Sequence, residues 1–230
     1  ILSALTLTCA AQSFDASIRT IHVADSNNIA FAGSGGFIGY TSTGGETWDT
    51  TRWAVKTPED SIIHPSFRSC YIVEDKIIAV GISAPGFIIR APLNDLHSST
   101  VVHADYDERT FWDSMQFWDS NNGIVMGDPT GDCLSIYITN NSGGDWHRVD
   151  CSNLPPTLKG EAAFAASNGN ISCVGSHAWI ATGGGASRVF HTTDLGLTWD
   201  VTNTPLIHGG TMTGASALSF NNEKDGSMIG

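Results

Sequence analysis

The octapeptide Thr192–Trp199, T-T-D-L-G-L-T-W, decides the fold. Degenerate copies occur at Thr41–Trp48 (T-S-T-G-G-E-T-W) and at Thr139–Trp146 (T-N-N-S-G-G-D-W). Each copy begins with Thr, has a short polar residue at the third position, Gly at the fifth and Trp at the eighth, and follows a short apolar run. A motif that recurs with its turn chemistry intact predicts a repeat architecture.

The octapeptide contains the residue types that a turn between two strands requires. Glycine at the fifth position supplies a positive φ, and Asp, Asn or Thr at the third accepts backbone N–H groups inside the turn. Trp at the eighth position can bury its ring against the neighbouring repeat. We therefore predict structural roles for Thr41, Thr43, Gly45, Trp48, Thr139, Asn141, Gly143, Trp146, Thr192, Asp194, Gly196 and Trp199.

Two further landmarks recur about every fifty residues. One is a short apolar run ended by glycine, which is typical of a strand buried on both faces. The other is an opening strand, expected at Ser17–Val23, Ser66–Ile72, Asp113–Trp118, Glu161–Ala166 and Ser216–Phe220. Four short strands in each repeat predict the blade of a β-propeller, because a β-sandwich would not repeat its turns at a fixed period.

The repeats divide the chain into units at 17–65, 66–110, 111–160, 161–213 and 214–230. We predict about four and a half four-stranded antiparallel blades, forming a single incomplete propeller domain over 12–230. The second unit lacks the Gly and Trp of the octapeptide around Ile88–Leu96.

Composition supports an all-β fold and excludes one class of partner. Of 230 residues 25 are glycine and only 15% are charged, as expected of many tight turns. The net charge of −12 repels a polyanion, so nucleic acid is not an expected partner. No apolar run approaches the ~20 residues of a membrane span.

The first eleven residues, I-L-S-A-L-T-L-T-C-A-A, are similar to the apolar core and cleavage site of a signal peptide. They predict a periplasmic or secreted protein. An ordinary apolar strand is the alternative, and a lipid anchor on Cys9 fits the preceding threonines badly. The cysteines after this segment allow three full disulfide pairings or buried free thiols, which the sequence does not separate: Cys70, Cys133, Cys151 and Cys173.

The three octapeptides resemble the Asp-box, or BNR, repeat of sialidase-like propellers. S-I-R-T-I-H-V at Ser17–Val23, followed by G-S-G-G and the first octapeptide, resembles the first blade of the photosystem II assembly and stability factor-like propellers. The stretches Gly123–Pro129, Leu154–Ser167 and Thr182–Phe190 resemble exported bacterial members of that group. The resemblance covers 17–230 and implies that the chain is a fragment of a seven-bladed propeller.

The opening strand of a propeller blade lines the central channel, and its first residues approach one mouth of that channel. Aligned by repeat, the residues at this position are Arg19, Arg68, Asp113, Glu161 and Ser216. Such a mixed-charge ring can bind a protein partner or a glycan through charge-assisted hydrogen bonds. Alternatively, these strand starts are charged for solubility. Asp128, in G-D-P after the second strand of its unit, joins this face or caps a turn.

The sequence holds no complete catalytic constellation. Arg19, Arg68 and Arg188 could imitate the arginine cluster of a sialidase, but S-I-R-T lacks the proline of the F/Y-R-I-P motif and no Tyr sits in a matching motif. Asp113 and Glu161 are weak candidates for the carboxylate pair of a glycosidase. No dinucleotide-binding, metal-binding or other cofactor motif is present. We therefore predict a non-catalytic binding or assembly-factor-like platform, with a glycoside hydrolase of sialidase-like fold as the alternative.

Overall fold

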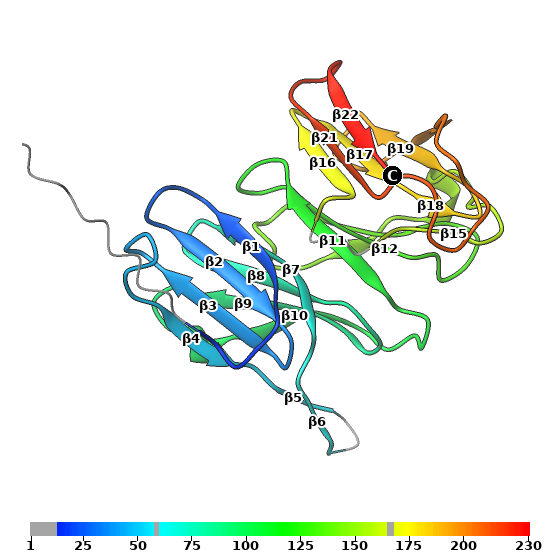
Figure 1. The fold of residues 1–230 in the computed structure, drawn as a ribbon. Coiled ribbons are helices and arrows are strands. Elements are labelled where there is room, and N and C mark those ends of the chain that lie inside the picture. The colour runs from blue at the N-terminus through cyan, green and yellow to red at the C-terminus, as the bar shows by residue number, and fades with distance from the viewer. Residues whose placement is uncertain (1–12, 58–59, 165–167) are drawn as a thin grey trace, which may run out of the picture.

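The computed structural model describes residues 13–57, 60–164 and 168–230. The predicted signal peptide therefore lies outside the described residues. Within them the chain forms consecutive antiparallel sheets that we call blades 1 to 5 (Figure 1). Blade 1 consists of β1 (Ile18–Val23), β2 (Ile29–Gly33), β3 (Phe37–Thr41) and β4 (Asp49–Arg52).

The following blades repeat this order. Blade 2 consists of β7 (Phe67–Val73), β8 (Lys76–Gly81), β9 (Gly86–Pro92) and β10 (Thr100–Asp105). Blade 3 consists of β11 (Trp112–Phe117), β12 (Gly123–Gly127), β13 (Ser135–Thr139) and β14 (His147–Arg148). Blade 4 consists of β16 (Ile171–Val174), β17 (His177–Ala181), β19 (Arg188–Thr192) and β20 (Asp200–Asn203). Blade 5 consists of β21 (Ala217–Phe220) and β22 (Gly226–Ile229).

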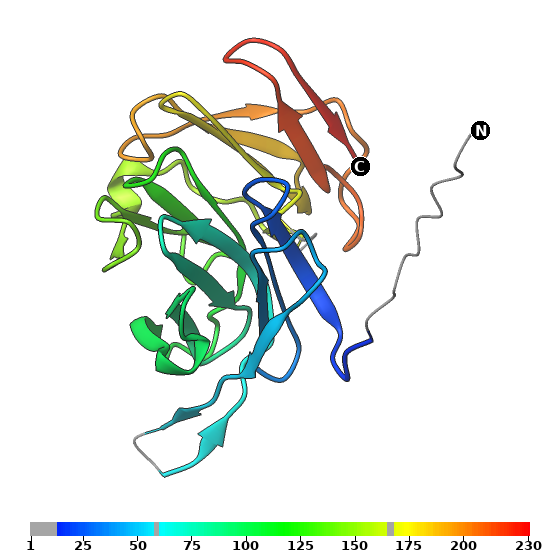
Figure 2. The same cartoon turned by 90° about the vertical axis from the view of Figure 1, so that its left-hand side faces the viewer.

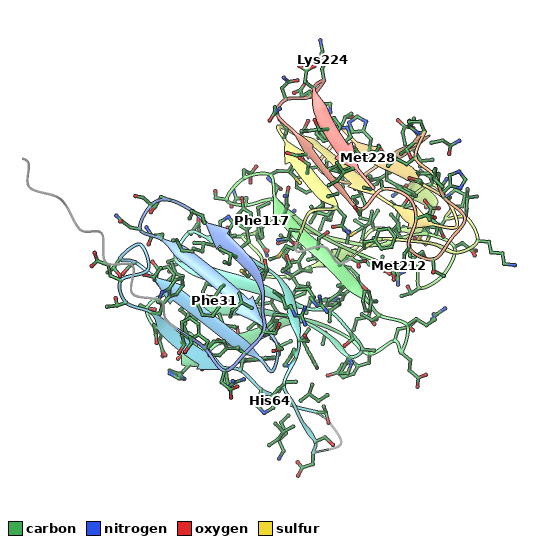
Figure 3. The ribbon with its side chains drawn as sticks, in the orientation of Figure 1. Phe31, His64, Phe117, Met212, Lys224 and Met228 are labelled. Carbon is green, nitrogen blue, oxygen red and sulfur yellow. A yellow bond between two sulfur atoms is a disulfide. The ribbon has the colours of Figure 1, made fainter. Side chains whose placement is uncertain are left out.

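Two short strand pairs and two 3-10 turns accompany the blades in the described residues. A hairpin between blades 1 and 2 pairs β5 (Val55–Lys56) with β6 (Ile62–Ile63), whereas β15 (Glu161–Ala162), before blade 4, pairs with β18 (Gly183–Gly184), which follows β17 in the chain. The 3-10 turns are η1 (Leu96–Ser98) and η2 (Cys151–Asn153). His64, beside β6, marks the first hairpin in Figure 3.

The blades follow one another around an arc from blue to red in Figure 2. The first strand of each blade lies against the first strand of the next, in the order β1, β7, β11, β16 and β21. This arrangement of inner strands confirms the predicted all-β propeller with four-stranded antiparallel blades.

The hydrophobic cores lie between blades and not within them. Blades 1 and 2 share one buried cluster, blades 2 and 3 the next, blades 3 and 4 a third, and blades 4 and 5 a fourth. In β8, for example, Ile77 and Ala79 face blade 1 while Ile78 and Val80 face blade 3. This alternation explains the continuous apolar runs, since a strand buried on both faces needs no polar face.

The outer faces of the two end blades carry exposed apolar side chains. On β1, Ile21 is 63% exposed and Val23 is 59% exposed, and on β22 Ile229 is 67% exposed. Part of the outer face of blade 1 is covered by Phe14, whose ring packs 5.0 Å from that of Phe31 (labelled in Figure 3).

A side chain at one register position joins successive inner strands. The backbone N–H of Ile72 donates to Nδ1 of His22 (3.0 Å), and that of Cys173 donates to Oε1 of Gln116 (2.9 Å). In the same way the N–H of Phe220 donates to the hydroxyl of Ser172 (3.1 Å). The pairing registers of β1, β11 and β16 place these three acceptors at equivalent positions.

Between blades 2 and 3 an aromatic contact takes the place of this bond. Tyr71 occupies the acceptor position, and its ring packs 5.1 Å from that of Phe117. Phe117 is labelled near the end of β11 in Figure 3.

The octapeptides form the predicted turns between the third and fourth strands. Gly45, Gly143 and Gly196 all have positive φ. Asp194 Oδ1 accepts the backbone N–H groups of Leu197 (3.1 Å) and Thr198 (2.9 Å). Each turn lies beside the beginning of the second strand of its blade, as the pairing of Thr41 with Ile29 shows for blade 1.

The tryptophan of each octapeptide precedes the outer strand by one residue. Trp146 belongs to the core between blades 2 and 3, and Trp199 to the core between blades 3 and 4. The indole N–H of Trp199 donates to Gly196 O (2.9 Å), whereas the indole N–H of Trp146 is buried without a partner among the described residues. In the degenerate second repeat, η1 replaces the turn and buries Leu96 completely between blades 1 and 2.

The cysteines divide into one bridge and two free thiols. Cys133 and Cys151 form a disulfide that attaches η2 to the loop between β12 and β13. Cys70 is buried between blades 1 and 2, and Cys173 lies on β16; both are free. The structure therefore has none of the three full pairings, and the buried free thiol that the sequence allowed is found at Cys70, while Cys173 is a partly buried free thiol.

We predict that Asp194→Ala lowers the free energy of unfolding by about 2 kcal/mol, because it removes the acceptor of two backbone N–H groups. Thr43→Ala should cost about half as much, because Thr43 accepts one backbone N–H, that of Thr47, at 3.0 Å. Asp194→Asn serves as the matched control, since Asn141 fills this position in blade 3. Urea denaturation measures the free energy of unfolding of all three variants. Equal decreases in Asp194→Ala and Thr43→Ala would contradict the proposed roles of the two side chains.

The hydrogen bond between His22 and Ile72 predicts that the stability of the protein falls in acid. Burial lowers the pKa of His22 from 6.5 to about 4, and its Nδ1 must stay unprotonated to accept the Ile72 N–H. The unfolded chain therefore binds the proton first, so this stabilisation is complete above pH 6.5 and is lost as the pH falls toward 4. The variant His22→Gln has the same residue type as Gln116 at this position. Its melting temperature should fall less between pH 7 and pH 4.5 than that of the wild type. An equal fall in the melting temperatures of the two proteins would refute a stabilising role for the hydrogen bond between His22 and Ile72.

Candidate binding site at the opening edge of the blades

We call the edge where the first strand of each blade begins the opening edge. In blades 1, 2 and 3 the first strand carries a one-residue bulge at its start, and the bulged residues are Arg19, Arg68 and Asp113. Their neighbours Ile18, Phe67 and Trp112 pair with the glycines that end the second strands. Bulges re-aim a side chain, and they occur often beside functional sites. The structure thus places these three predicted residues at one register position.

Glu161 does not join them, and its predicted place on the opening strand of blade 4 is wrong. The inner strand of blade 4 is β16, where Ile171 pairs with Ile180, while Glu161 lies on β15 and pairs with Gly184. Counted by this register, Gly169 stands where Asp113 stands in blade 3. Ser216, which precedes β21 and donates its N–H to Ile229 O (2.9 Å), keeps the predicted position in blade 5.

Glu161 and Arg188 instead neutralise one another in the interior. Glu161 Oε1 accepts from Nε of Arg188 (2.9 Å) and from the hydroxyl of Thr182 (2.6 Å). Its Oε2 accepts from Nη2 of Arg188 (2.5 Å) and from the N–H of Leu158 (2.8 Å). Nη2 also donates to Pro156 O (2.8 Å). A buried pair whose hydrogen bonds are satisfied in this way holds a structure together, and neither residue is left to bind a ligand.

This geometry also argues against the predicted carboxylate pair of a glycosidase. Asp113 is 0% exposed and Glu161 is 4% exposed, so neither reaches a sugar in this conformation. Arg188 is likewise committed to Glu161 and cannot complete a sialidase-like arginine cluster with Arg19 and Arg68.

Asp113 is a buried carboxyl group whose hydrogen bonds are not satisfied. Neither of its oxygens has a hydrogen-bond partner among the described residues, and Nε of the neighbouring Arg68 is buried without a partner as well. Burial raises the pKa of Asp113 well above its usual value, the negative charge of Asp128 raises it further, and Arg68 opposes the shift. Unsatisfied buried groups with perturbed pKa values are typical of functional sites, because they destabilise the fold that carries them.

Asp128 lies at the end of β12, on the same edge of blade 3. Its backbone N–H donates to Phe111 O (2.9 Å), and its Oδ1 accepts the N–H of Ala163 (2.9 Å). The side chain is half-buried, and burial raises its pKa. Asp128 therefore does more than cap a turn, because its side chain ties blade 3 to the segment that leads into blade 4.

The sequence prediction missed Asn168. This residue has a positive φ of 67°, and its Oδ1 accepts the hydroxyl of Ser69 (2.5 Å) and the N–H of Met115 (3.0 Å). It therefore connects the inner strands of blades 2 and 3 with the segment before β16. The dipeptide Asn168–Gly169 was the available signal, since Asn and Gly adopt positive φ more readily than other residues.

The described residues contain no group of three or more His, Cys, Asp and Glu side chains arranged to hold a metal ion. They also contain no helix with the length and apolar character that crossing a membrane requires.

Comparison with known proteins bears on the fold. No protein-family model matches the sequence, and no curated protein does. Among solved structures, YCF48 from Cyanidioschyzon merolae is similar over 96% of this chain and 68% of its own, with 16% identity and a TM-score of 0.58. The chain is a partial β-propeller. U3-55K is similar over 94% of this chain and 59% of its own (14% identity, TM-score 0.62). The WD40 β-propeller domain of Doa1 is similar over 94% of this chain and 63% of its own (12% identity, TM-score 0.53).

We predict that Asp113→Asn stabilises the protein at neutral pH. Because the folded-state pKa of Asp113 is raised, the native protein binds the proton more tightly than the unfolded chain, and stability falls as the pH rises from about 4 through the folded pKa. Asn carries no such charge, so the variant should melt above the wild type at pH 7, and the difference should shrink toward pH 4. A melting temperature below that of the wild type at pH 7 would contradict this account.

Proposed function

We propose that the protein is a non-catalytic Asp-box propeller of an exported bacterial kind that serves as a binding platform in the periplasm or outside the cell. Its opening edge docks a protein partner through the groups around Arg68 and Asp113. The observation that supports this most directly is that the buried carboxyl group of Asp113 and the buried Nε atom of the half-buried Arg68 both lack hydrogen-bond partners among the described residues, at equivalent positions of neighbouring blades. A structural role alone would favour the satisfied arrangement found for Glu161 and Arg188.

Two further observations support the proposal. The disulfide between Cys133 and Cys151 fits an oxidising compartment, as export would provide. The burial of Asp113 and Glu161 disfavours glycoside hydrolysis as the alternative, because general acid and base groups must reach their substrate. Binding of a glycan without hydrolysis remains the competing ligand class, and the experiment below separates it from a protein partner.

A photo-crosslinking amino acid placed at Glu108 tests the docking face. Glu108 is exposed in the loop that precedes β11, at the opening edge, whereas Glu46 is exposed in the first octapeptide, at the opposite edge. In the exported fraction of the native host, we expect a discrete protein adduct from position 108 and none from position 46. Arg68→Ala should abolish the adduct.

Lys224→Ala is the matched charge control, because Lys224 lies at the tip of the β21–β22 turn (Figure 3). It should leave the adduct unchanged. An adduct that survives Arg68→Ala, or that forms equally at position 46, overturns the proposed face. Retention on a glycan array with no protein adduct would assign the site to a glycan.

A further inference from the structure

A hollow of about 360 Å³ opens beside Asp128 at the opening edge. One wall is the loop after β12, with Pro129 and Gly131, and the other is the segment before β15, with Thr157 and Leu158. The two walls are tied together. The backbone N–H of Thr157 donates to Asp132 O (2.8 Å), and the Cys133–Cys151 disulfide joins the same two segments.

The charge that this hollow presents is negative. Asp128 is one of its lining residues, and its Oδ1 accepts the Ala163 N–H while Oδ2 accepts no hydrogen bond from the described residues. The other lining acid, Glu161, is already neutralised by Arg188. No Lys or Arg is among the lining residues.

Asp113 adds a second carboxyl group in the interior, which contributes to this negative potential when it is ionised. It is completely buried, both its oxygens lack partners among the described residues, and its charge acts on that of Asp128. Arg68 is the cation that partly compensates it, yet no ion pair joins Arg68 and Asp113 within the described residues. When both carboxyl groups are ionised, Arg68 compensates only one of the two negative charges, and Asp128 is the acid of the two that lines the hollow.

We propose that the hollow binds the primary ammonium group of a lysine side chain presented by a partner polypeptide. This inference rests on the proposed function, because it names the chemical group that the opening edge selects. An ammonium ion is a compact point charge and suits a carboxylate with a single available oxygen. A guanidinium binds a carboxylate most strongly through both oxygens, and Oδ1 of Asp128 already accepts the Ala163 N–H.

Binding of the ammonium ion is coupled to release of protons. The pKa values of Asp113 and Asp128 are both raised, and a cation beside Asp128 favours the ionised form of each. The proton leaves to solvent as the ammonium ion enters. Affinity for the cation therefore rises with pH until the carboxyl groups are ionised in the free protein. Asp113 acts here as a positioning residue, because it does not contact the ligand.

Isothermal titration calorimetry with three short capped peptides tests the proposal. The peptides are identical except for a central Lys, Arg or Gln. We expect the Lys peptide to bind at least about tenfold more tightly than the Gln peptide and more tightly than the Arg peptide. Asp128→Asn should weaken binding of the Lys peptide by about tenfold or more. Asp132→Asn, the same charge change at an exposed neighbour, should change it less than about twofold.

A second measurement separates charge selection from damage to the hollow. Titration in two buffers of different ionisation enthalpy should show proton release with the wild type and less release with Asp113→Asn. Equal binding of the Lys and Gln peptides to the wild type overturns the proposal, as does an equal loss in Asp128→Asn and Asp132→Asn. Because the assay needs no native partner, a failed cross-link from position 108 with intact Lys selectivity would refute the protein-docking proposal but not the lysine site.

Discussion

The structure depends on apolar packing between neighbouring blades. In blades 2, 3 and 4 the second and third strands bury one face against the preceding blade and the other against the following blade, so these sheets have no core of their own. The octapeptide turn serves this packing by placing a Trp in the space between two blades. Where the motif is lost, in blade 2, Leu96 on a 3-10 turn fills the corresponding space. Blade stacking therefore tolerates changes in the turn as long as the space between blades is filled.

The sequence is sufficient to predict the propeller fold. It does not predict which charged side chains form ion pairs. Glycine and Trp at fixed spacing report local turn geometry, which is why the blades were predicted from Thr192–Trp199 and its copies. Unit 4 misled the prediction because it carries an additional segment, so the short strand β16 was displaced from its expected place. The pairing of Glu161 with Arg188 joins residues far apart in sequence and has no local signal. Repeat alignment gave the register positions of Arg19, Arg68 and Asp113 but not that Asp113 is buried without partners.

The buried carboxyl groups of Glu161 and Asp113 differ in the hydrogen bonds that they accept. The carboxylate of Glu161 receives four hydrogen bonds, while that of Asp113 receives none from the described residues. Both are buried, so burial alone does not separate structural acids from functional ones. Hydrogen-bond satisfaction does, because an unsatisfied buried carboxyl group costs stability unless something outside the protein completes it.

The inner-strand joints through His22, Gln116 and Ser172 each connect a blade only to the next one. Blades 2, 3 and 4 are held from both sides, whereas blade 1 and blade 5 are each held from one side in the described structure. In stacked repeats a unit that packs on both sides opens less readily than a unit that packs on one side. The centre of the described arc, which carries Asp113 and Asp128, has this two-sided support.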